Sequence, residues 1–221
     1  PGVYSLNPLS KDEGIVTSFF LEGPVDRLLN ILDASQIERN LHLTLQLLEY
    51  EKPALIGLNM IDVANNRGVQ IDAEKLSGIV GVPVVPVVAR SGKGCDRLIE
   101  VISTSSNHSK VKKHVYYGKT IEDAITKLSI ELIGKTEHSP RWLAIQLFEG
   151  NEYVKNYLSN LIKPSQLESL ISHLESEVIQ ENNHVKSLTN YIYVKRKEVI
   201  EIILTASVQK VRTVEPMSEK I

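Results

Sequence analysis

The sequence has very little cysteine, since Cys95 is the only one among 221 residues. An internal disulfide is therefore excluded, and a reducing compartment is the simplest setting. No stretch approaches the ~18 consecutive apolar residues that a membrane-spanning helix requires. Basic residues are not in excess either, because 25 Lys and Arg stand against 27 Asp and Glu. This balance argues against a nucleic-acid-binding protein, which normally carries a basic face.

Histidines with the spacing of metal ligands are also missing. Zinc sites draw on closely spaced His and Cys residues. The six histidines are instead scattered along the chain, at His42, His108, His114, His138, His173 and His184. We therefore expect no metal site in this chain, and Cys95 is expected to be a small buried residue.

The first half of the sequence alternates buried strands with amphipathic helices. Strands are predicted at 26–34, 53–60 and 82–89, and helices at 35–51, 72–81 and 95–103. Consecutive parallel strands need crossover connections, so this order predicts an α/β fold with a parallel sheet and helices on both faces. Pro83 and Pro86 place the third strand near an edge or an irregular spot.

The second half contains helical patterns and no convincing strand. Helices are predicted at 120–134, 139–150, 165–180 and 190–211. The polar stretch 104–113, which includes three lysines, is typical of a linker. We therefore divide the chain into an α/β part, 1–109, and a small all-α part, 110–221.

Several positions in these helices have a predicted structural role. Ser35 with Glu38, and Ser165 with Glu168, have the spacing of a capping box. Ser139 is expected to cap the helix that begins at Pro140. Trp142 and its apolar neighbours Leu143, Ile145 and Phe148 are expected to form a core patch. Lys195 and Arg196 are expected to be solvated, with contact to the α/β part or to a membrane surface as the alternative.

Two loops at the ends of predicted strands carry the residues that suggest a function. Asn59, Met60 and Asp62 follow the second strand, and Ala89, Arg90 and Ser91 follow the third. In an open parallel sheet, ligands bind at the carboxyl ends of the strands. A buried carboxylate there can accept hydrogen bonds from N1–H and N2–H₂ of guanine, whereas adenine offers no such pair. Sites of this kind discriminate by ~10⁴ or more.

The roles of these two loops have a simpler alternative. Asn and Asp after a strand are commonly turn formers and helix caps. The tetrapeptide from Asn59 to Asp62 is weak by itself, and the second loop with its small residue and two glycines favours the guanine interpretation. Asn59 is expected to tie its loop to the neighbouring one, and the backbone of 89–91 is expected to donate to guanine O6.

Longer pieces of the sequence resemble a known family. The stretch PGVYSLNPLSKDE (1–13) resembles the third nucleotide-binding motif and switch II of the bacterial ferrous iron transport protein B family. LDASQIERNLHLTLQLLE (32–49), LNMIDVANNRGVQID (58–72) and GVPVVPVVARSGKG (81–94) resemble that family's guanine-nucleotide domain in unbroken order. RWLAIQLFEGNEYV (141–154) and the ending EPMSEKI resemble its helical domain and the lead into its membrane part.

The resemblance implies a GTP-binding and GTP-hydrolysing domain on the cytoplasmic face of the bacterial inner membrane. A helical domain that slows GDP release would follow and couple to a ferrous iron permease. By this resemblance Asn59 and Asp62 match the guanine-specificity motif, and Ala89, Arg90 and Ser91 match the fifth motif. Gly2 matches the third-motif glycine, whose N–H reaches the γ-phosphate. The implied ligands are GTP or GDP with Mg²⁺, and the implied partner is the transporter's membrane part. A homo-oligomer is left open.

The sequence departs from the pattern of GTP-binding proteins at three points. Met60 stands where many small GTPases carry a Lys over the base, and a Met can cover a ring face as well. Ala89 replaces a more usual Ser. No G-x-x-x-x-G-K-[ST] motif is present, and Lys93 in SGKGC is followed by Gly94 rather than by a hydroxyl residue.

The missing motif leads to an expectation about the chain as printed. Without a phosphate cradle and the ligands for Mg²⁺, it should bind GTP poorly and hydrolyse it negligibly. We expect the first half of the sheet to precede Pro1, and the remaining strands to expose an edge and a face. Two alternatives stay open: a non-catalytic helical interaction module with a relic α/β domain, and a GTPase of another class.

Overall fold

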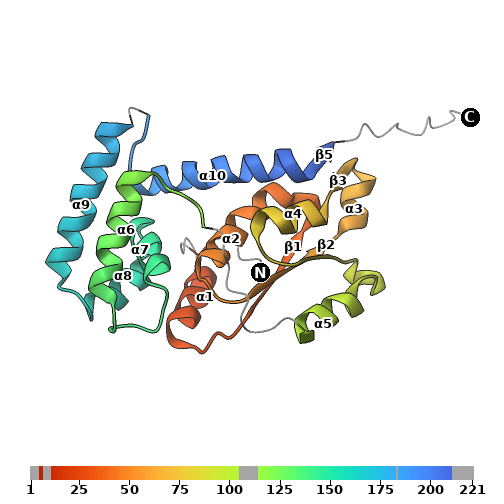
Figure 1. Cartoon of the computed structure of the whole chain (residues 1–221), viewed down its shortest axis with the longest axis horizontal. Coiled ribbons are helices and arrows are strands. Elements are labelled where there is room, and N and C mark those ends of the chain that lie inside the picture. The colour runs from red at the N-terminus through yellow and green to blue at the C-terminus, as the bar shows by residue number, and fades with distance from the viewer. Residues whose placement is uncertain (1–4, 7–10, 105–113, 183, 211–221) are drawn as a thin grey trace, which may run out of the picture.

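The computed structural model describes residues 5–6, 11–104, 114–182 and 184–210 (Figure 1). Its main sheet has the strand order β1-β2-β4, with both pairs parallel. The strands are β1 (Leu28–Asp33), β2 (Ala54–Asn59) and β4 (Val84–Pro86). The predicted parallel sheet is therefore confirmed, and β4 lies at an edge of the described strands, as Pro83 and Pro86 indicated.

Helices cover both faces of this sheet, as predicted. Side chains alternate along β2, so that Ile56 and Leu58 belong to the main core and Leu55 belongs to a second, smaller one. The main core also contains side chains of α2 (Ile37–Glu49) and α4 (Ala73–Val80). The smaller core is closed by Leu98 of α5 (Cys95–Thr104). Period-two alternation of the strands thus assigns one helix layer to each face.

The face of the sheet that carries α5 is only partly covered. Leu29 and Ile31 of β1 point to this face and are 45% and 51% exposed, and Ile99 of α5 is 60% exposed. The prediction that the sheet exposes an apolar face is confirmed. Exposed apolar side chains that share one face of a strand are typical of interaction surfaces.

Five elements of the α/β half were not predicted from the sequence. They are α1 (Lys11–Glu22), η1 (Ala34–Gln36), α3 (Ile61–Asn66), β3 (Val69–Ile71) and η2 (Ala89–Ser91). Elements of three to six residues are too short for a periodic pattern. Helix α1 is longer, but it contains Gly14 and its amphipathic pattern is weak, so the sequence does not indicate a helix there.

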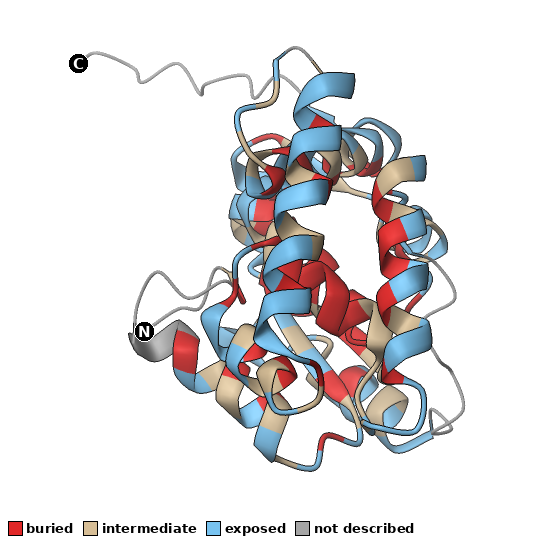
Figure 2. Ribbon diagram, turned by 90° about the vertical axis from the view of Figure 1, so that its left-hand side faces the viewer, coloured by how far each residue is buried: buried red, intermediate tan, exposed pale blue. Residues whose placement is uncertain are grey.

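The helical half consists of five described helices. They are α6 (Lys119–Leu132), α7 (Pro140–Phe148), α8 (Glu152–Ser159), α9 (Pro164–Glu181) and α10 (Leu188–Ser207). Figure 2 shows that buried residues concentrate where the helices face one another. Helix α7 is buried on all sides from Trp142 to Phe148, so the predicted core patch is confirmed. Helix α8 was not predicted.

Helix α10 joins the two halves of the molecule. It runs from the helical half across the α/β half, where it packs against α2 and α4 (Figure 1). At its end the chain forms β5 (Val208–Lys210), which pairs antiparallel with β3. The prediction of a helix to residue 211 in an all-α second half is therefore wrong at this point. Three residues of strand are sustained by pairing with β3, which a local pattern cannot reveal.

Of the three predicted helix caps, one is present in the structure and two are not. The Ser139 hydroxyl accepts from the N–H of Trp142 at 3.2 Å, so this cap is confirmed. At α2 the Ser35–Glu38 box does not form, because Asp33 caps η1 by accepting from the N–H of Ser35. At α9 Pro164 takes the first helical position, which moves Ser165 inside the helix.

No helix in the described residues is long and apolar enough to cross a membrane. Part of the predicted linker, 105–113, lies outside the described residues. The lysines of that stretch are therefore not placed.

Candidate functional site

The two loops predicted to form a site lie side by side at the carboxyl ends of β2 and β4. The side-chain oxygen of Asn59 accepts a hydrogen bond from the N–H of Ala89 at 3.1 Å. One residue earlier, the N–H of Val87 donates to the carbonyl of Leu58 at 2.9 Å. The predicted tie from Asn59 to the neighbouring loop is thus present, and it fixes the position of one loop relative to the other.

Met60 turns the chain sharply at the end of β2. It adopts a left-handed conformation, φ 60° and ψ 31°, which few non-glycine residues adopt. Its carbonyl accepts from the N–H of Ala64 at 3.0 Å and so begins α3. Strained backbone of this kind clusters at ligand sites. The turn leaves the Met60 side chain 39% exposed at the end of β2.

Asp62 lies in the first turn of α3 and is exposed. The expectation of a buried carboxylate is therefore wrong for this structure, because the first turn of α3 lies at the surface. Among the described residues, none forms a hydrogen bond or ion pair with the Asp62 side chain. Both of its oxygens are therefore available to a ligand.

The second loop begins with Ala89, Arg90 and Ser91, which form η2 and are exposed. The N–H of Ser91 donates to the carbonyl of Val88 at 3.0 Å, and the N–H of Val88 donates to the carbonyl of Lys93 at 2.8 Å. Gly94 closes the loop with φ 81°, and a side chain there would collide with the carbonyl of Pro86. The glycines therefore serve a tight turn, which agrees with the view that SGKGC is no phosphate-binding loop.

Gly2, assigned to the γ-phosphate by resemblance, lies outside the described residues. The structure therefore gives no account of that assignment. No group of three or more His, Cys, Asp or Glu side chains within the described residues is arranged to hold a metal ion.

A buried ion cluster joins the two halves, and sequence reasoning missed it. Arg196 of α10 is 2% exposed, so the expectation that it is solvated is wrong. Its guanidinium pairs with Glu49 of α2 at 2.9 Å and with Glu149, next to α7, at 2.5 Å. The alternative of contact with the α/β part is the correct one. A signal was present, because Arg196 interrupts the apolar stripe Ile192–Ile200 at helical spacing.

Two carboxylates share this one guanidinium. The Tyr117 hydroxyl donates to Glu49, and side-chain amides of Gln46 and Gln146 donate to Glu149. Burial raises the pKa of Glu49, although Arg196 opposes that shift. Burial also raises the pKa of Tyr117 well above its ordinary value, and the Glu49 charge adds to the shift. Nε of Arg196 is buried without a hydrogen-bond partner among the described residues, so the cluster is incompletely satisfied as well as buried.

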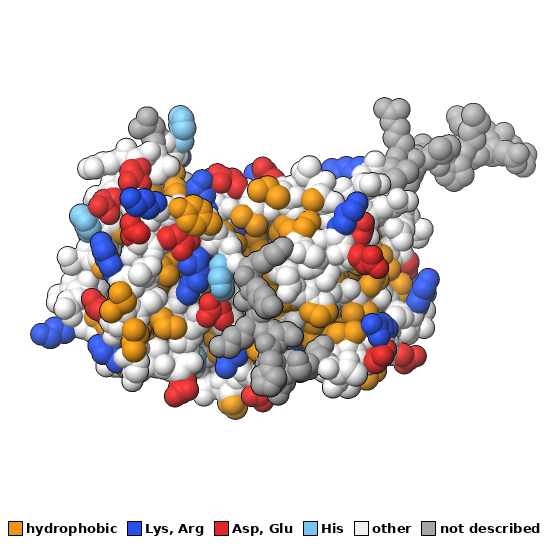
Figure 3. Space-filling model, in the orientation of Figure 1, with side chains coloured by type: hydrophobic (Ala, Val, Ile, Leu, Met, Phe, Trp, Pro, Cys, Tyr) orange, Lys and Arg blue, Asp and Glu red, His pale blue; other side chains and the backbone are white. Residues whose placement is uncertain are grey.

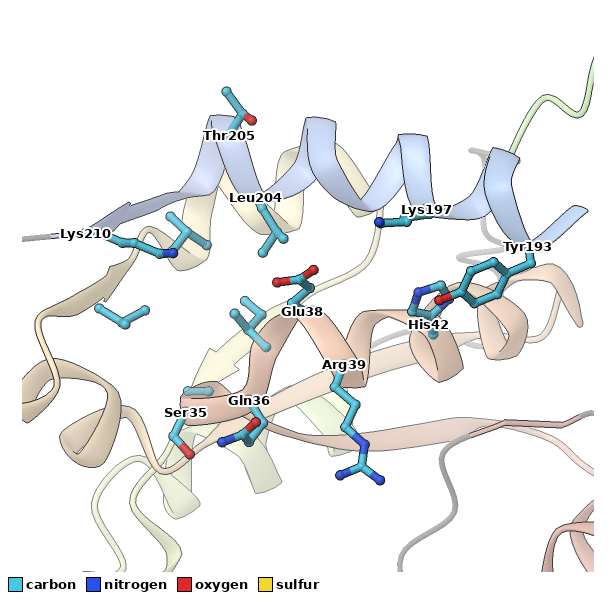
Figure 4. Close-up of a pocket in the computed structure, with 14 residues that line it drawn as sticks. Ser35, Gln36, Glu38, Arg39, His42, Tyr193, Lys197, Leu204, Thr205 and Lys210 are labelled. Carbon is cyan, nitrogen blue, oxygen red and sulfur yellow. The ribbon is translucent and has the colours of Figure 1, made fainter. Parts of the chain in front are cut away.

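A cavity of about 710 Å³ opens between α2, α10 and the β3–β5 ribbon (Figure 4). Figure 4 shows Glu38 facing α10, with His42 beside Tyr193 at one end. His42 and Tyr193 are stacked, with ring centroids 4.9 Å apart. None of the predicted guanine-binding residues lines this cavity. Charges of both signs are interspersed on the face in Figure 3, without a basic stripe.

Solved structures with the same architecture define the class of protein. A GDP-bound mutant of the S. thermophilus FeoB G-domain is 29% identical, with a TM-score of 0.79 over 95% of this chain and 79% of that one. An mGMPPNP-bound form from S. thermophilus is 30% identical, with a TM-score of 0.78 over 96% and 79%. The fold is therefore an α/β G domain with a parallel sheet, followed by a helical domain.

Sequence comparisons give the family. The family model described as "Ferrous iron transport protein B" matches residues 1–102, and the one described as "FeoB cytosolic helical domain" matches residues 117–209. The Fe(2+) transporter FeoB of Staphylococcus aureus (strain MSSA476) is 39% identical over 80% of this chain. That of Escherichia coli (strain K12) is 31% identical over 96%. The chain belongs to the FeoB family of ferrous iron transport proteins.

The match covers only a part of those relatives. The chain spans 27% of the length of the S. aureus protein and 28% of the E. coli protein. It corresponds to the G domain and cytosolic helical domain of the family.

Proposed function

We propose that this chain reads the guanine base in the GTP-binding region of a bacterial ferrous iron transporter. In this proposal Asp62 accepts hydrogen bonds from N1–H and N2–H₂ of guanine, and Met60 covers one face of the ring. Asn59 holds the loop of Ala89, Arg90 and Ser91 in place. The amides of Ala89 and Ser91 already have acceptors in the protein, so the donor to guanine O6 falls to Arg90.

The observation that carries this proposal is the hydrogen bond from Ala89 to Asn59. It brings together two loops that are 30 residues apart in the sequence, at the edge where parallel sheets bind ligands. An Asn that only capped a turn would bond to its own loop. The relatives that are bound to GDP or mGMPPNP in their solved structures support guanine as the base.

For the phosphates of the nucleotide we propose no binding residues. The printed sequence contains no G-x-x-x-x-G-K-[ST] motif, and Gly2 lies outside the described residues. We therefore assign base recognition to residues 1–109 and no catalytic residue for hydrolysis. The chain by itself should bind GTP weakly and hydrolyse it negligibly, even though its family uses GTP hydrolysis.

The helical domain, for which we propose the bounds 110–221, is the regulatory part. Its contact with the G domain through Glu49, Glu149 and Arg196 supports a role in slowing GDP release. In the whole transporter we expect these domains at the cytoplasmic face of the inner membrane, with the transporter's own membrane part as the partner. Mg²⁺ would accompany the phosphates, and the carried ferrous iron would be handled elsewhere in the transporter.

A titration of this chain with nucleosides tests the base-reading site. Backbone NMR resonances of 59–62 and 89–91 should shift with millimolar guanosine or GDP, and not with adenosine or ADP. Nucleosides are the sharper probe because they need no phosphate cradle. Equal shifts with guanosine and adenosine, or shifts confined to residues outside these two loops, would contradict the proposal.

A further inference from the structure

Leu6 is held by side chains from distant parts of the chain. Its N–H donates to the side-chain oxygen of Gln46 at 2.9 Å. Its carbonyl accepts from Nδ2 of Asn151 at 2.9 Å and from the hydroxyl of Thr17 at 2.8 Å. Leu6 is fully buried, so water does not replace these partners. A buried backbone group that loses its partner is costly, and this makes the position of Leu6 strongly determined.

The partners of Leu6 come from both halves of the molecule. Gln46 belongs to α2 of the G domain, whereas Asn151 precedes α8 of the helical domain. Asn151 is itself fixed, because its Oδ1 caps α8 by accepting from the N–H of Tyr153 at 3.1 Å and of Val154 at 3.3 Å. Its Nδ2 also donates to Gln146 at 2.9 Å. One fully buried amide therefore serves a helix cap and the Leu6 carbonyl together.

Helix α1, which follows Leu6, is held in the same shared way. The Tyr50 hydroxyl donates to the carbonyl of Phe20 at 2.8 Å. Nε2 of His138, from the helical half, donates to the carbonyl of Leu21 at 3.1 Å. Near its start, Gly14 packs so closely on the Tyr153 ring that a side chain at this position would collide with it. Both ends of the segment are therefore anchored to both domains.

We propose that Asn151 is a positioning residue that sets where Leu6 and α1 stand relative to the helical domain. The inference goes beyond the proposed reading of the base, and it concerns a stretch, 1–13, whose sequence resembles the third nucleotide-binding motif and switch II. The Leu6 carbonyl can move only if Asn151 lets go of it or moves with it. Through Gln146, which bonds to Glu149 at 3.0 Å, Asn151 is linked to the ion cluster of Arg196. We therefore expect a shift of Leu6 to disturb the hydrogen bonds of Arg196 in α10 as well.

Hydrogen exchange of this chain without nucleotide tests the proposal. Asn151→Ser keeps an oxygen that caps α8 but removes the Nδ2 donor to Leu6. We expect amides of 14–22 to exchange at least about threefold faster, while those of 152–159 stay within about twofold of wild type. Asn160→Ser is the matched control, because Asn160 is exposed at the other end of α8. It should leave both segments unchanged.

A second variant guards against a general loss of stability. Thr17→Val removes the hydroxyl donor to the same carbonyl at nearly constant shape and should speed exchange in 14–22 alone. Asn151 would have only a structural role if Asn151→Ser left 14–22 unchanged or sped exchange of 152–159 equally. Because no nucleotide is present, this result is independent of guanosine binding. Failure of guanosine to bind would overturn the proposed function, and not the positioning of α1.

Discussion

At the scale of single residues, the largest surprise is Arg196. Its residue type assigns it to the surface, because arginine is seldom fully buried, although the helical spacing places it on the apolar face. It is buried because Glu49 and Glu149 meet it from two other elements, and neither distance is visible in a linear sequence. The predicted guanine residues behave differently. Asn59 and Ala89 are brought together as expected, since the order of parallel strands decides which loops become neighbours.

Replacing Arg196 should destabilise the whole chain. Arg196→Met leaves two carboxylates facing each other without a counter-charge, which costs about 3–5 kcal/mol. Lys197→Met, one residue further on the exposed side of α10, should change stability by about 0.5 kcal/mol or less. Urea unfolding of both variants measures the difference. A loss below about 1 kcal/mol for Arg196→Met would show that the cluster does not hold the domains together.

Two glutamates should give opposite pH dependences of stability. The pKa of Glu49 is raised by burial, so its contribution is present at low pH and is lost as pH rises through the raised value. Burial also acts to raise the pKa of Glu122, but hydrogen bonds from Arg141 and Tyr117 outweigh it and the pKa is lowered. The Glu122 contribution is therefore present above the ordinary glutamate pKa and is lost as pH falls through the lowered value.

Free energies of unfolding between about pH 3 and 8 separate the two effects. The loss of stability that Glu49→Gln causes relative to wild type should become smaller as pH rises. The loss that Glu122→Gln causes should become larger. Parallel curves for the two variants would refute the assigned directions.

At the scale of elements, the sequence predicts those whose apolar residues follow a clear pattern. The strands that became β1 and β2, and helices α2, α6 and α9, all follow from apolar spacing. Elements that depend on a tertiary partner were missed. Strand β5 exists because β3 pairs with it, and the cap of α9 differs because Pro164 occupies the first position. Met60 was recognised as a site residue, but its left-handed backbone has no signature in the sequence.

The two serines that looked like helix caps provide a matched test. Ser139→Ala removes the hydroxyl that accepts from Trp142 and should cost about 1 kcal/mol of stability. Ser165→Ala, a similar substitution inside the first turn of α9, should cost about 0.5 kcal/mol or less. Thermal and urea unfolding compare them directly. Equal losses would mean that Ser165 caps α9 after all.

At the scale of the whole molecule, the exposed face of β1 has a consequence for assembly. Leu29 and Ile31 present apolar surface that a soluble domain seldom leaves open. The double substitution of Leu29 and Ile31 by Thr places β-branched, more polar residues on the strand and should reduce concentration-dependent self-association in sedimentation velocity. Ile130→Thr, at an exposed apolar position of α6, is the control and should leave association unchanged. Unaltered association in the double variant would show that this face does not mediate it.

The central claim is that the α/β half reads guanine through Asp62. The most direct measurement compares wild type and Asp62→Asn in NMR titrations with guanosine and xanthosine. An Asn presents a donor where the Asp presents an acceptor, so its complement is the C2 carbonyl of xanthine rather than the amino group of guanine. We predict that Asp62→Asn loses the guanosine shifts at 59–62 and 89–91 and gains them with xanthosine. Unchanged guanosine shifts in Asp62→Asn would contradict the account.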